Sequence, residues 1–211
     1  MTDTSAGRRP VKSRNSTLLQ KAAQWLADKN VTPNQISKAS MVFAGLSCLS
    51  FCFSGLLNAP LLFILAAIFI QLRLLANLID GLVAVEGGMG TRDGLFWNEA
   101  PDRVSDTLIL VGAGIAISVP SLGLLAAVSA LMTAYVRVLS SSLVGKEDFS
   151  GPMAKQHRMA VMTGAALLGA FEAGYSGTSF ALFLGLSIVT LGAGYTALQR
   201  AQTLLRHLSA H

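Results

Sequence analysis

The sequence predicts an all-α integral membrane protein, with six transmembrane helices and an N-terminal interfacial amphipathic helix. Hydrophobic residues make up 52% of the 211 residues and charged residues only 13%, and the mean hydropathy is +0.56. A soluble domain carries about 25% charged residues. The apolar residues also gather into runs of roughly 20, the length that crosses the hydrocarbon core of a bilayer. A soluble helical protein with an unusually apolar core is the less favoured alternative.

The elements follow one another from a polar start. Residues 1–16 are polar and basic, and we expect them to be a disordered cytoplasmic tail, with one membrane domain over residues 17–211. Residues 17–29 space their apolar side chains as a helix lying in the membrane interface does. Thr32 then suits a helix N-cap, with Pro33 at the first helical position. The six spans are expected over residues 36–57, 60–84, 94–118, 122–143, 159–173 and 179–205.

The connections between the spans predict the orientation of the chain. The connections near residues 58–60, 119–121 and 174–177 are short and contain no Lys or Arg. The basic residues, Arg200 among them, gather on the opposite side, which the positive-inside rule assigns to the cytoplasm. Both termini are then cytoplasmic, which requires an even number of spans. The net charge of +5 follows mainly from this asymmetry.

Other interpretations of this charge are attraction to anionic lipid headgroups or to anionic substrates. We expect no nucleic-acid partner, because the basic residues are scattered along one membrane face without interleaved aromatics. Cys48 and Cys52 lie one helical turn apart in the first span, and they are interpreted as packing residues.

Polar residues gather inside the second, third and fourth spans, where each charge is costly unless it is paired or functional. The second span places three of them at spacings of four and three residues, so they share one helix face, and the third span places Asn98, Asp102 and Asp106 on another. The two spans are joined by a short cytoplasmic loop, so these faces can meet near the cytoplasmic surface. The complete set is Arg73, Asn77, Asp80, Asn98, Glu99, Asp102, Arg103, Asp106 and Arg137.

Carboxylate and amide oxygens converging in this way suit a hard divalent cation, which often binds through one or two carboxylates and substrate phosphates. Two other interpretations stay open on spacing alone. In the first, Arg73, Arg103 and Arg137 neutralise the aspartates in a structural network. In the second, the buried acids form a proton or ion pathway.

The stretch from Asn77 to Asp102 resembles the signature of the CDP-alcohol phosphotransferase family, D-x2-D-G-x2-A-R-x8-G-x3-D-x3-D. Every spacing agrees. Five of the eight signature positions agree in identity, namely Asp80, Gly81, Ala84, Gly94 and Asp102. The three departures are Asn77 and Asn98 in place of aspartate and Val85 in place of arginine. The helix start at Thr32 and the plan of six spans are also similar to the family.

The resemblance implies a transferase of phospholipid biosynthesis. It would move a phosphoalcohol group, such as the phosphatidyl group of CDP-diacylglycerol, to an acceptor hydroxyl and release CMP. Mg²⁺ or Mn²⁺ would be the cofactor, and Asp102 would act as ligand or general base. The resemblance also implies a homodimer in contact with membrane lipids in a bacterial inner membrane. The implied metal ligands are Asn77, Asp80, Asn98 and Asp102, and the implied nucleotide-binding residues are Asp80, Gly81, Ala84 and Gly94.

The two asparagines leave three interpretations of the metal site open. The site holds a single metal, or it recruits a replacement acid, or it is inactive. Asp106 continues the face of Asn98 and Asp102 and is the favoured replacement, ahead of Glu86 and Glu99, although pairing with a deeper arginine is an equal alternative. An inactive member would bind lipid or act as a membrane scaffold. A small transporter is a third, less favoured function.

The resemblance further implies an anion pocket for a phosphorylated acceptor, formed by the fourth span and the loop that follows it. The candidates are Arg137, Lys155, His157 and Arg158. Arginine can bind a phosphate through two parallel N–H groups, whereas lysine acts as a point charge. For Lys155 and Arg158, the alternative is that they only follow the positive-inside rule. A phosphorylated polyol is weakly preferred as the acceptor.

Overall fold

The computed structural model describes residues 17–57, 59–86, 88 and 93–209, and the expected tail at residues 1–16 lies outside this part of the chain. The described residues form seven helices and no strand, in agreement with the all-α prediction. The helices are α1 (Thr17–Asp28), α2 (Pro33–Leu57), α3 (Pro60–Glu86), α4 (Gly94–Ala116), α5 (Pro120–Val144), α6 (Lys155–Ser176) and α7 (Phe180–Ser209). The division into a tail and one domain stays a prediction.

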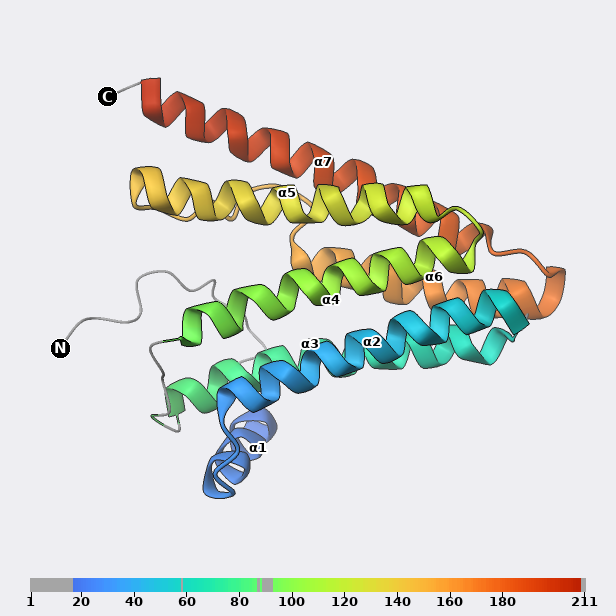
Figure 1. Ribbon diagram of the computed structural model, residues 1–211, viewed down its shortest axis with the longest axis horizontal. Coiled ribbons are helices and arrows are strands. Elements are labelled where there is room, and N and C mark those ends of the chain that lie inside the picture. The colour runs from blue at the N-terminus through green and yellow to red at the C-terminus, as the bar shows by residue number, and fades with distance from the viewer. Residues whose placement is uncertain (1–16, 58, 87, 89–92, 210–211) are drawn as a thin grey trace.

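The six long helices run roughly along the long axis of the molecule, and α1 crosses near one end (Figure 1). Each long helix packs mainly against two others, and these pairs close a ring in the order α2, α3, α6, α7, α5, α4. Successive helices alternate in direction. Gly88, Asp93 and residues 145–154 therefore lie at one end of the ring, called here the long-loop end, and the shorter connections lie at the other.

The start of α2 has the capping residues that the sequence predicts. The backbone N–H of Gln35 donates to Oγ1 of Thr32 at 3.3 Å, and the N–H of Thr32 donates to Oε1 of Gln35 at 3.0 Å. This reciprocal cap, with Pro33 at the first helical position, confirms Thr32 as the N-cap. The start of α6 was predicted four residues too late, because the hydropathy of residues 155–158 is low whereas their backbone is helical.

The core of the ring consists of apolar side chains from every long helix. Phe51, Ile70, Leu110, Met162 and Leu186 are each completely buried in it. Small residues bring helices α4 and α5 unusually close. A Cβ atom added to Gly114 would lie 2.8 Å from the Cα of Gly123, so a larger residue cannot be placed there without moving a backbone.

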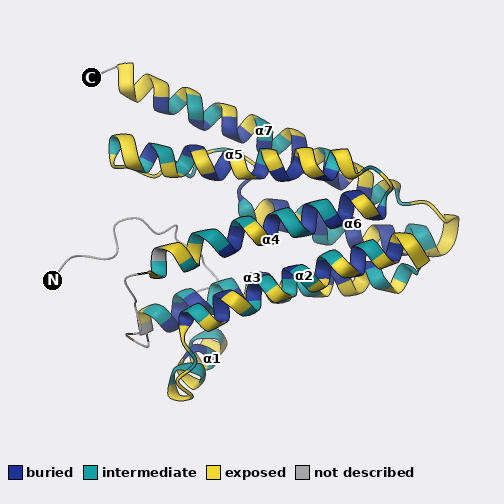
Figure 2. Cartoon of the chain, in the orientation of Figure 1, coloured by how far each residue is buried: buried dark blue, intermediate teal, exposed yellow. Residues whose placement is uncertain are grey.

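The outer surface is apolar, as a membrane protein requires. Large hydrophobic side chains are exposed on every long helix, for example Leu61 at 76%, Leu168 at 64% and Leu191 at 75%. Figure 2 shows exposed and buried faces alternating along the helices. By length and composition, four described helices can cross a membrane, namely α2, α3 over Pro60–Val85, α5 and α7. Helices α4 and α6 carry more polar and charged residues, so the count of six spans stays a prediction.

Helix α1 packs against α3 and closes a second, smaller core. Ala23 is buried there together with Ile36, Leu82 and Val83. On its other faces, α1 exposes Leu18 to 77% and Trp25 to 60%. These two side chains are what an interfacial helix would place among lipid headgroups, and the interfacial position itself stays a prediction.

Candidate active site at the long-loop end

The polar faces of α3 and α4 meet, as their spacing predicts. Arg73 Nη2 donates to Oδ1 of Asp102 at 3.2 Å and to Oδ1 of Asp106 at 2.9 Å. One turn further along α3, the amide of Asn77 donates to Oδ1 of Asp102. Three residues of the site predicted from the sequence (Asn77, Asp102 and Asp106) are thus brought together at this helix pair.

Asp102 has donors on both carboxylate oxygens. Its Oδ1 accepts hydrogen bonds from Arg73 and Asn77. Its Oδ2 forms an ion pair with Nζ of Lys155, the first residue of α6. The residue is only 7% exposed. A buried carboxylate with two cationic partners is stabilised in its ionised form. Before Asp102 can bind a metal or take a proton through Oδ2, Lys155 must move away.

Asp80 has one carboxylate oxygen that accepts no hydrogen bond in the described structure. It is 5% exposed, and its Oδ2 accepts a hydrogen bond of 2.7 Å from Oγ of Ser37 on α2. Its Oδ1 is buried and has no hydrogen-bond partner among the described residues. Asp80 lies one turn after Asn77 on α3, within electrostatic range of Asp102 and Lys155. A buried oxygen without a donor is the position where a cation would be favourable.

Asp106 takes the structural role that the sequence left as an alternative. Arg73 contacts its Oδ1 at 2.9 Å, and Nη2 of Arg158 contacts its Oδ2 at 2.6 Å. Arg158 is 3% exposed and also donates to Oγ1 of Thr133 and to the carbonyl of Met153. Both oxygens of Asp106 are therefore engaged by arginines, deeper in the bundle than Asp102.

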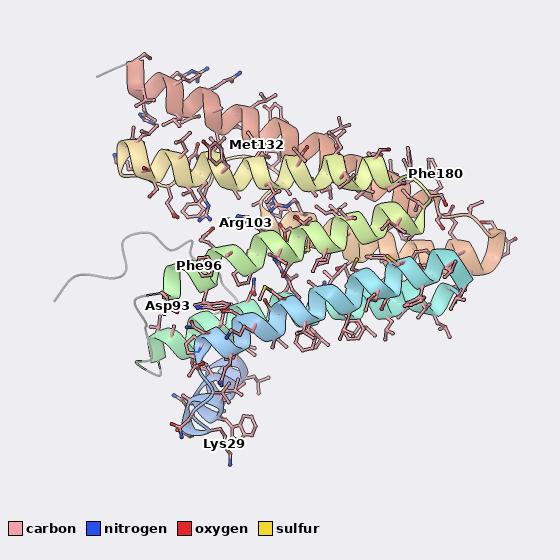
Figure 3. All side chains as sticks on the ribbon, viewed as in Figure 1. Lys29, Asp93, Phe96, Arg103, Met132 and Phe180 are labelled. Carbon is pink, nitrogen blue, oxygen red and sulfur yellow. The ribbon has the colours of Figure 1, made fainter. Side chains whose placement is uncertain are left out.

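A second group of ion pairs joins α4 to α5 and to the loop after it. Glu99 forms ion pairs with Arg103, one turn along α4, and with Arg137 of α5. Figure 3 shows Arg103 on the side of α4 that faces α5. Arg137 also contacts Oε2 of Glu147 at 3.3 Å, and its guanidinium carbon lies 5.6 Å from the ring centre of Phe149. Glu99 is thus directed toward arginines.

The loop of residues 145–154 is held against the bundle by Arg200 and Thr196 of α7. Arg200 donates from Nε to the carbonyl of Ser150 at 2.9 Å and from Nη1 to the carbonyl of Thr133 at 2.8 Å. The N–H of Met153 donates to Oγ1 of Thr196 at 3.1 Å. These contacts fix the start of α6, and hence Lys155 and Arg158, relative to α4.

The remaining predicted residues lie at the same end with fewer contacts. Gly81 and Ala84 follow Asp80 on α3, and Gly94 begins α4; all are partly exposed. Asn98 is exposed. The side chain of Glu86 lies outside the described part of the structure. His157 is exposed, with Nδ1 at 2.6 Å from the carbonyl of Pro152.

Two residues that contribute to the site, Ser37 and Arg200, were not predicted from the sequence. Ser37 belongs to a buried face of α2 on which serines recur at helical spacing, at positions 37, 40, 47, 50 and 54. That periodicity was the available signal for a polar contact from α2. Arg200 was interpreted only as part of the positive side, although a basic residue inside the last span was a signal for a buried partner.

The donor set fits one divalent cation better than two. No group of three His, Cys, Asp or Glu residues suited to a metal occurs in the described ranges. The vacant Oδ1 of Asp80, with the amide oxygen of Asn77 one turn before it on α3, nevertheless offers the hard oxygen ligands that Mg²⁺ and Mn²⁺ prefer. Asp102 adds to this set once Lys155 is displaced.

The fold is similar to that of phosphatidylinositol phosphate synthase PgsA1 from Mycobacterium tuberculosis. The structure with CDP-DAG bound has a TM-score of 0.74 and 19% sequence identity, covering 90% of this chain and 94% of that chain. The complex with manganese and citrate also has a TM-score of 0.74 and 19% identity, covering 89% and 88%.

Two proteins are similar in sequence. The inner membrane protein YnbA of Escherichia coli is 31% identical over 149 residues, which is 70% of this chain and 73% of that protein. An uncharacterized protein of Aquifex aeolicus is 29% identical over 198 residues, 91% of each chain. No family model matches the chain.

Proposed function

The chain belongs to the family of the inner membrane protein YnbA and has the fold of the CDP-alcohol phosphotransferases, and we propose that it is a phosphatidyltransferase. It takes a phosphatidyl group from CDP-diacylglycerol, or a related group from another CDP-alcohol, and passes it to an acceptor hydroxyl with release of CMP. The acceptor oxygen forms a bond to the phosphorus that carries the lipid, and the bond from that phosphorus to CMP breaks.

One observation carries this proposal. Asp80 and Asp102, which keep their identities at the signature positions, lie within electrostatic range of each other at the long-loop end, and Asp80 has a buried oxygen without a donor. The PgsA1 structures with the same fold bind CDP-DAG in one case and manganese in another. A site with this chemistry at the long-loop end suits a diphosphate that arrives with its lipid in the bilayer.

Each residue has a proposed role. Asp80 would be the principal metal ligand, assisted by Asn77 and Asn98 through their amide oxygens. Asp102 would accept the proton of the acceptor hydroxyl when Lys155 moves from its Oδ2 toward the phosphate. Gly81, Ala84 and Gly94 would leave space for the nucleotide beside Asp80. A bound Mg²⁺ or Mn²⁺ would polarise the diphosphate and stabilise charge on the departing CMP.

The membrane arrangement is part of the proposal. We propose that α2 to α7 are six spans with the long-loop end in the cytoplasm, where CDP-alcohols and water-soluble acceptors meet. The charges of α4 and α6 are compatible with this because they pair inside the ring, as Asp106 does with Arg158. Both termini would then be cytoplasmic. A homodimer stays a proposal on the family resemblance alone.

A second candidate function is favoured by the ion pair of Lys155 with Asp102. Together with the two asparagines, this ion pair leaves the site with fewer negative charges for a metal than the signature provides. In this alternative the protein binds a CDP-lipid without turning it over and acts as a membrane scaffold.

Release of CMP separates the two candidates. Purified protein would be supplied with CDP-diacylglycerol, Mn²⁺ or Mg²⁺, and a panel of alcohols. We expect acceptor-dependent CMP release that is lost in Asp80→Ala and Asp102→Ala, and kept in Asp28→Asn, a matched loss of one exposed acid on α1. Binding of CDP-diacylglycerol without CMP release for any acceptor would favour the scaffold.

A further inference from the structure

The basic side chains beside Asp102 are already matched by carboxylates. Lys155 is paired with Asp102 itself, Arg158 with Asp106, and Arg137 with Glu99. Of the four residues expected to hold a phosphorylated acceptor, only the exposed His157 has no acidic partner in the described structure, and its Nδ1 faces a carbonyl.

Each of the ion-paired cations in this cluster has a carboxylate partner. These ion pairs and the neighbouring Asp80 comprise five basic and five acidic side chains in the described structure. The basic residues are Arg73, Arg103, Arg137, Lys155 and Arg158, and the acidic residues are Asp80, Glu99, Asp102, Asp106 and Glu147. A phosphate monoester adds a charge of roughly −1.5 to −2 near neutral pH. It would have to break ion pairs and leave carboxylates unpaired, whereas an uncharged alcohol needs only hydrogen bonds.

Arg137 is the decisive residue, because arginine binds phosphate through two free N–H groups on one edge. Its Nη2 lies 2.6 Å from both carboxylate oxygens of Glu99. Its Nη1 lies 3.3 Å from Glu147, and Phe149 lies over the guanidinium face. Both terminal nitrogens are engaged by carboxylates, and one face is covered. The edge of the guanidinium formed by Nη1 and Nη2 is therefore occupied, and a phosphate could bind there only by displacing Glu99 and Glu147.

We propose that the acceptor is an unphosphorylated alcohol, and that Glu99 and Glu147 determine this specificity by occupying Arg137. The inference rests on the transferase function proposed above and names the class of its second substrate. It replaces the weak preference for a phosphorylated polyol that the basic loop suggested from the sequence. Glu99 and Glu147 are specificity-determining residues here, and they take no part in the bond-making step.

Matched pairs of acceptors test the proposal on the full-length protein. CMP release from CDP-diacylglycerol would be compared for glycerol against glycerol 3-phosphate and for inositol against inositol phosphate. We expect kcat/KM to be higher for the unphosphorylated member of at least one pair, by about 10-fold or more, the value of one lost charge-assisted hydrogen bond. Equal or higher kcat/KM for the phosphorylated members would overturn the proposal and leave the transferase function intact.

A variant tests the named residues. Glu99→Gln with Glu147→Gln frees Arg137, and the ratio of kcat/KM for phosphorylated to unphosphorylated acceptor should rise about 10-fold, mainly through KM. A merely structural role would lower the rate for both acceptors and leave the ratio unchanged, which would contradict the assignment. Glu172→Gln is the matched control, since Glu172 lies at the opposite end, where it accepts hydrogen bonds from the first amides of α7.

Calorimetric binding of glycerol 3-phosphate gives a readout that needs no turnover. We expect no measurable binding to the native protein and binding to the double variant. Tight binding to the native protein would overturn the exclusion of phosphate. Absence of CMP release with every acceptor would instead refute the transferase function, and with it the naming of an acceptor, while the calorimetry still decides whether Arg137 is available to a phosphate.

Discussion

Arg158 at the start of α6 donates from Nη2 to Oδ2 of Asp106 on α4 at 2.6 Å, and both side chains are almost completely buried. Asp106 also forms an ion pair with Arg73 of α3 through its other carboxylate oxygen. Three helices of the ring are therefore joined through a single carboxylate. The position of Lys155, three residues before Arg158, depends on the same contact, so the buried network and the site above it share one support.

Asp106→Asn is predicted to destabilise the protein. The change leaves the buried Arg158 without an anionic partner and Arg73 with Asp102 alone. Breaking a buried ion pair from one side costs about 3–5 kcal/mol. Thermal unfolding in detergent should show a clearly lower Tm than for the native protein. Asp28→Asn removes an exposed acid on α1 and should leave Tm unchanged. A Tm for Asp106→Asn within error of the control would show that the network contributes nothing to stability.

Restoring the signature acids is predicted to affect the two positions differently. Asn77→Asp removes the amide that donates to Asp102 and places a like charge against it, so the metal-free protein should lose about 1–3 kcal/mol. Asn98 is exposed, so Asn98→Asp should change stability little. Both variants should bind Mn²⁺ more tightly.

Calorimetric titration with Mn²⁺ and thermal unfolding with and without the ion measure these effects. We expect added Mn²⁺ to recover the Tm that Asn77→Asp loses, because the cation separates the two carboxylates. Unchanged Mn²⁺ affinity in both variants would contradict a metal position between α3 and α4.

Much of this arrangement followed from residue spacing. The polar residues of each span were separated by multiples of a helical turn, so their common faces could be predicted, and a short loop made those faces neighbours. The ion pairs of Arg73 with Asp102 and Asp106 agree with that prediction. Helix starts at prolines could also be predicted from a few neighbouring residues, as the cap at Thr32 demonstrates.

The choice of partners was not predictable in the same way. Spacing placed Asp80, Asp102 and Asp106 close together, but it did not decide which would contact a cation and which would keep a vacant oxygen. That outcome depends on Ser37, Lys155 and Arg158, which come from α2 and α6. Such contacts between distant segments depend on helix rotation and side-chain rotamers, and neither is fixed by the spacing within one helix.

The proposed topology predicts opposite accessibility for the two ends of the ring. After Cys48 and Cys52 are replaced by serine, a single cysteine would be introduced at Ser121 or at Lys146, both of which are exposed. A membrane-impermeant thiol reagent should label Ser121→Cys from the outside of intact cells. It should label Lys146→Cys only after the membrane is opened. Labelling of both from the same side would exclude an odd number of spans between these positions.

Two glycines of the loop after α5 give a matched pair of substitutions. Gly145 has a φ of 68° and Gly151 a φ of 100°, so alanine at either position adopts a left-handed backbone that costs about 1–2 kcal/mol. A Cβ at Gly145 meets nothing within 4 Å, whereas a Cβ at Gly151 lies 2.5 Å from Cγ2 of Thr196. Only the second substitution adds a steric clash to the backbone strain.

Thr196 cannot easily move to relieve that clash. It is completely buried, its Oγ1 donates to the carbonyl of Gly192 at 2.7 Å, and the same oxygen accepts from the N–H of Met153. Gly151→Ala should therefore cost roughly 2–5 kcal/mol and displace the loop that positions Lys155. We expect a larger fall in Tm and in CMP release for Gly151→Ala than for Gly145→Ala. Thr196→Ser removes Cγ2 and keeps the hydroxyl, so it should restore part of both losses; equal effects of the two alanine variants would show that contact with Thr196 does not position the loop.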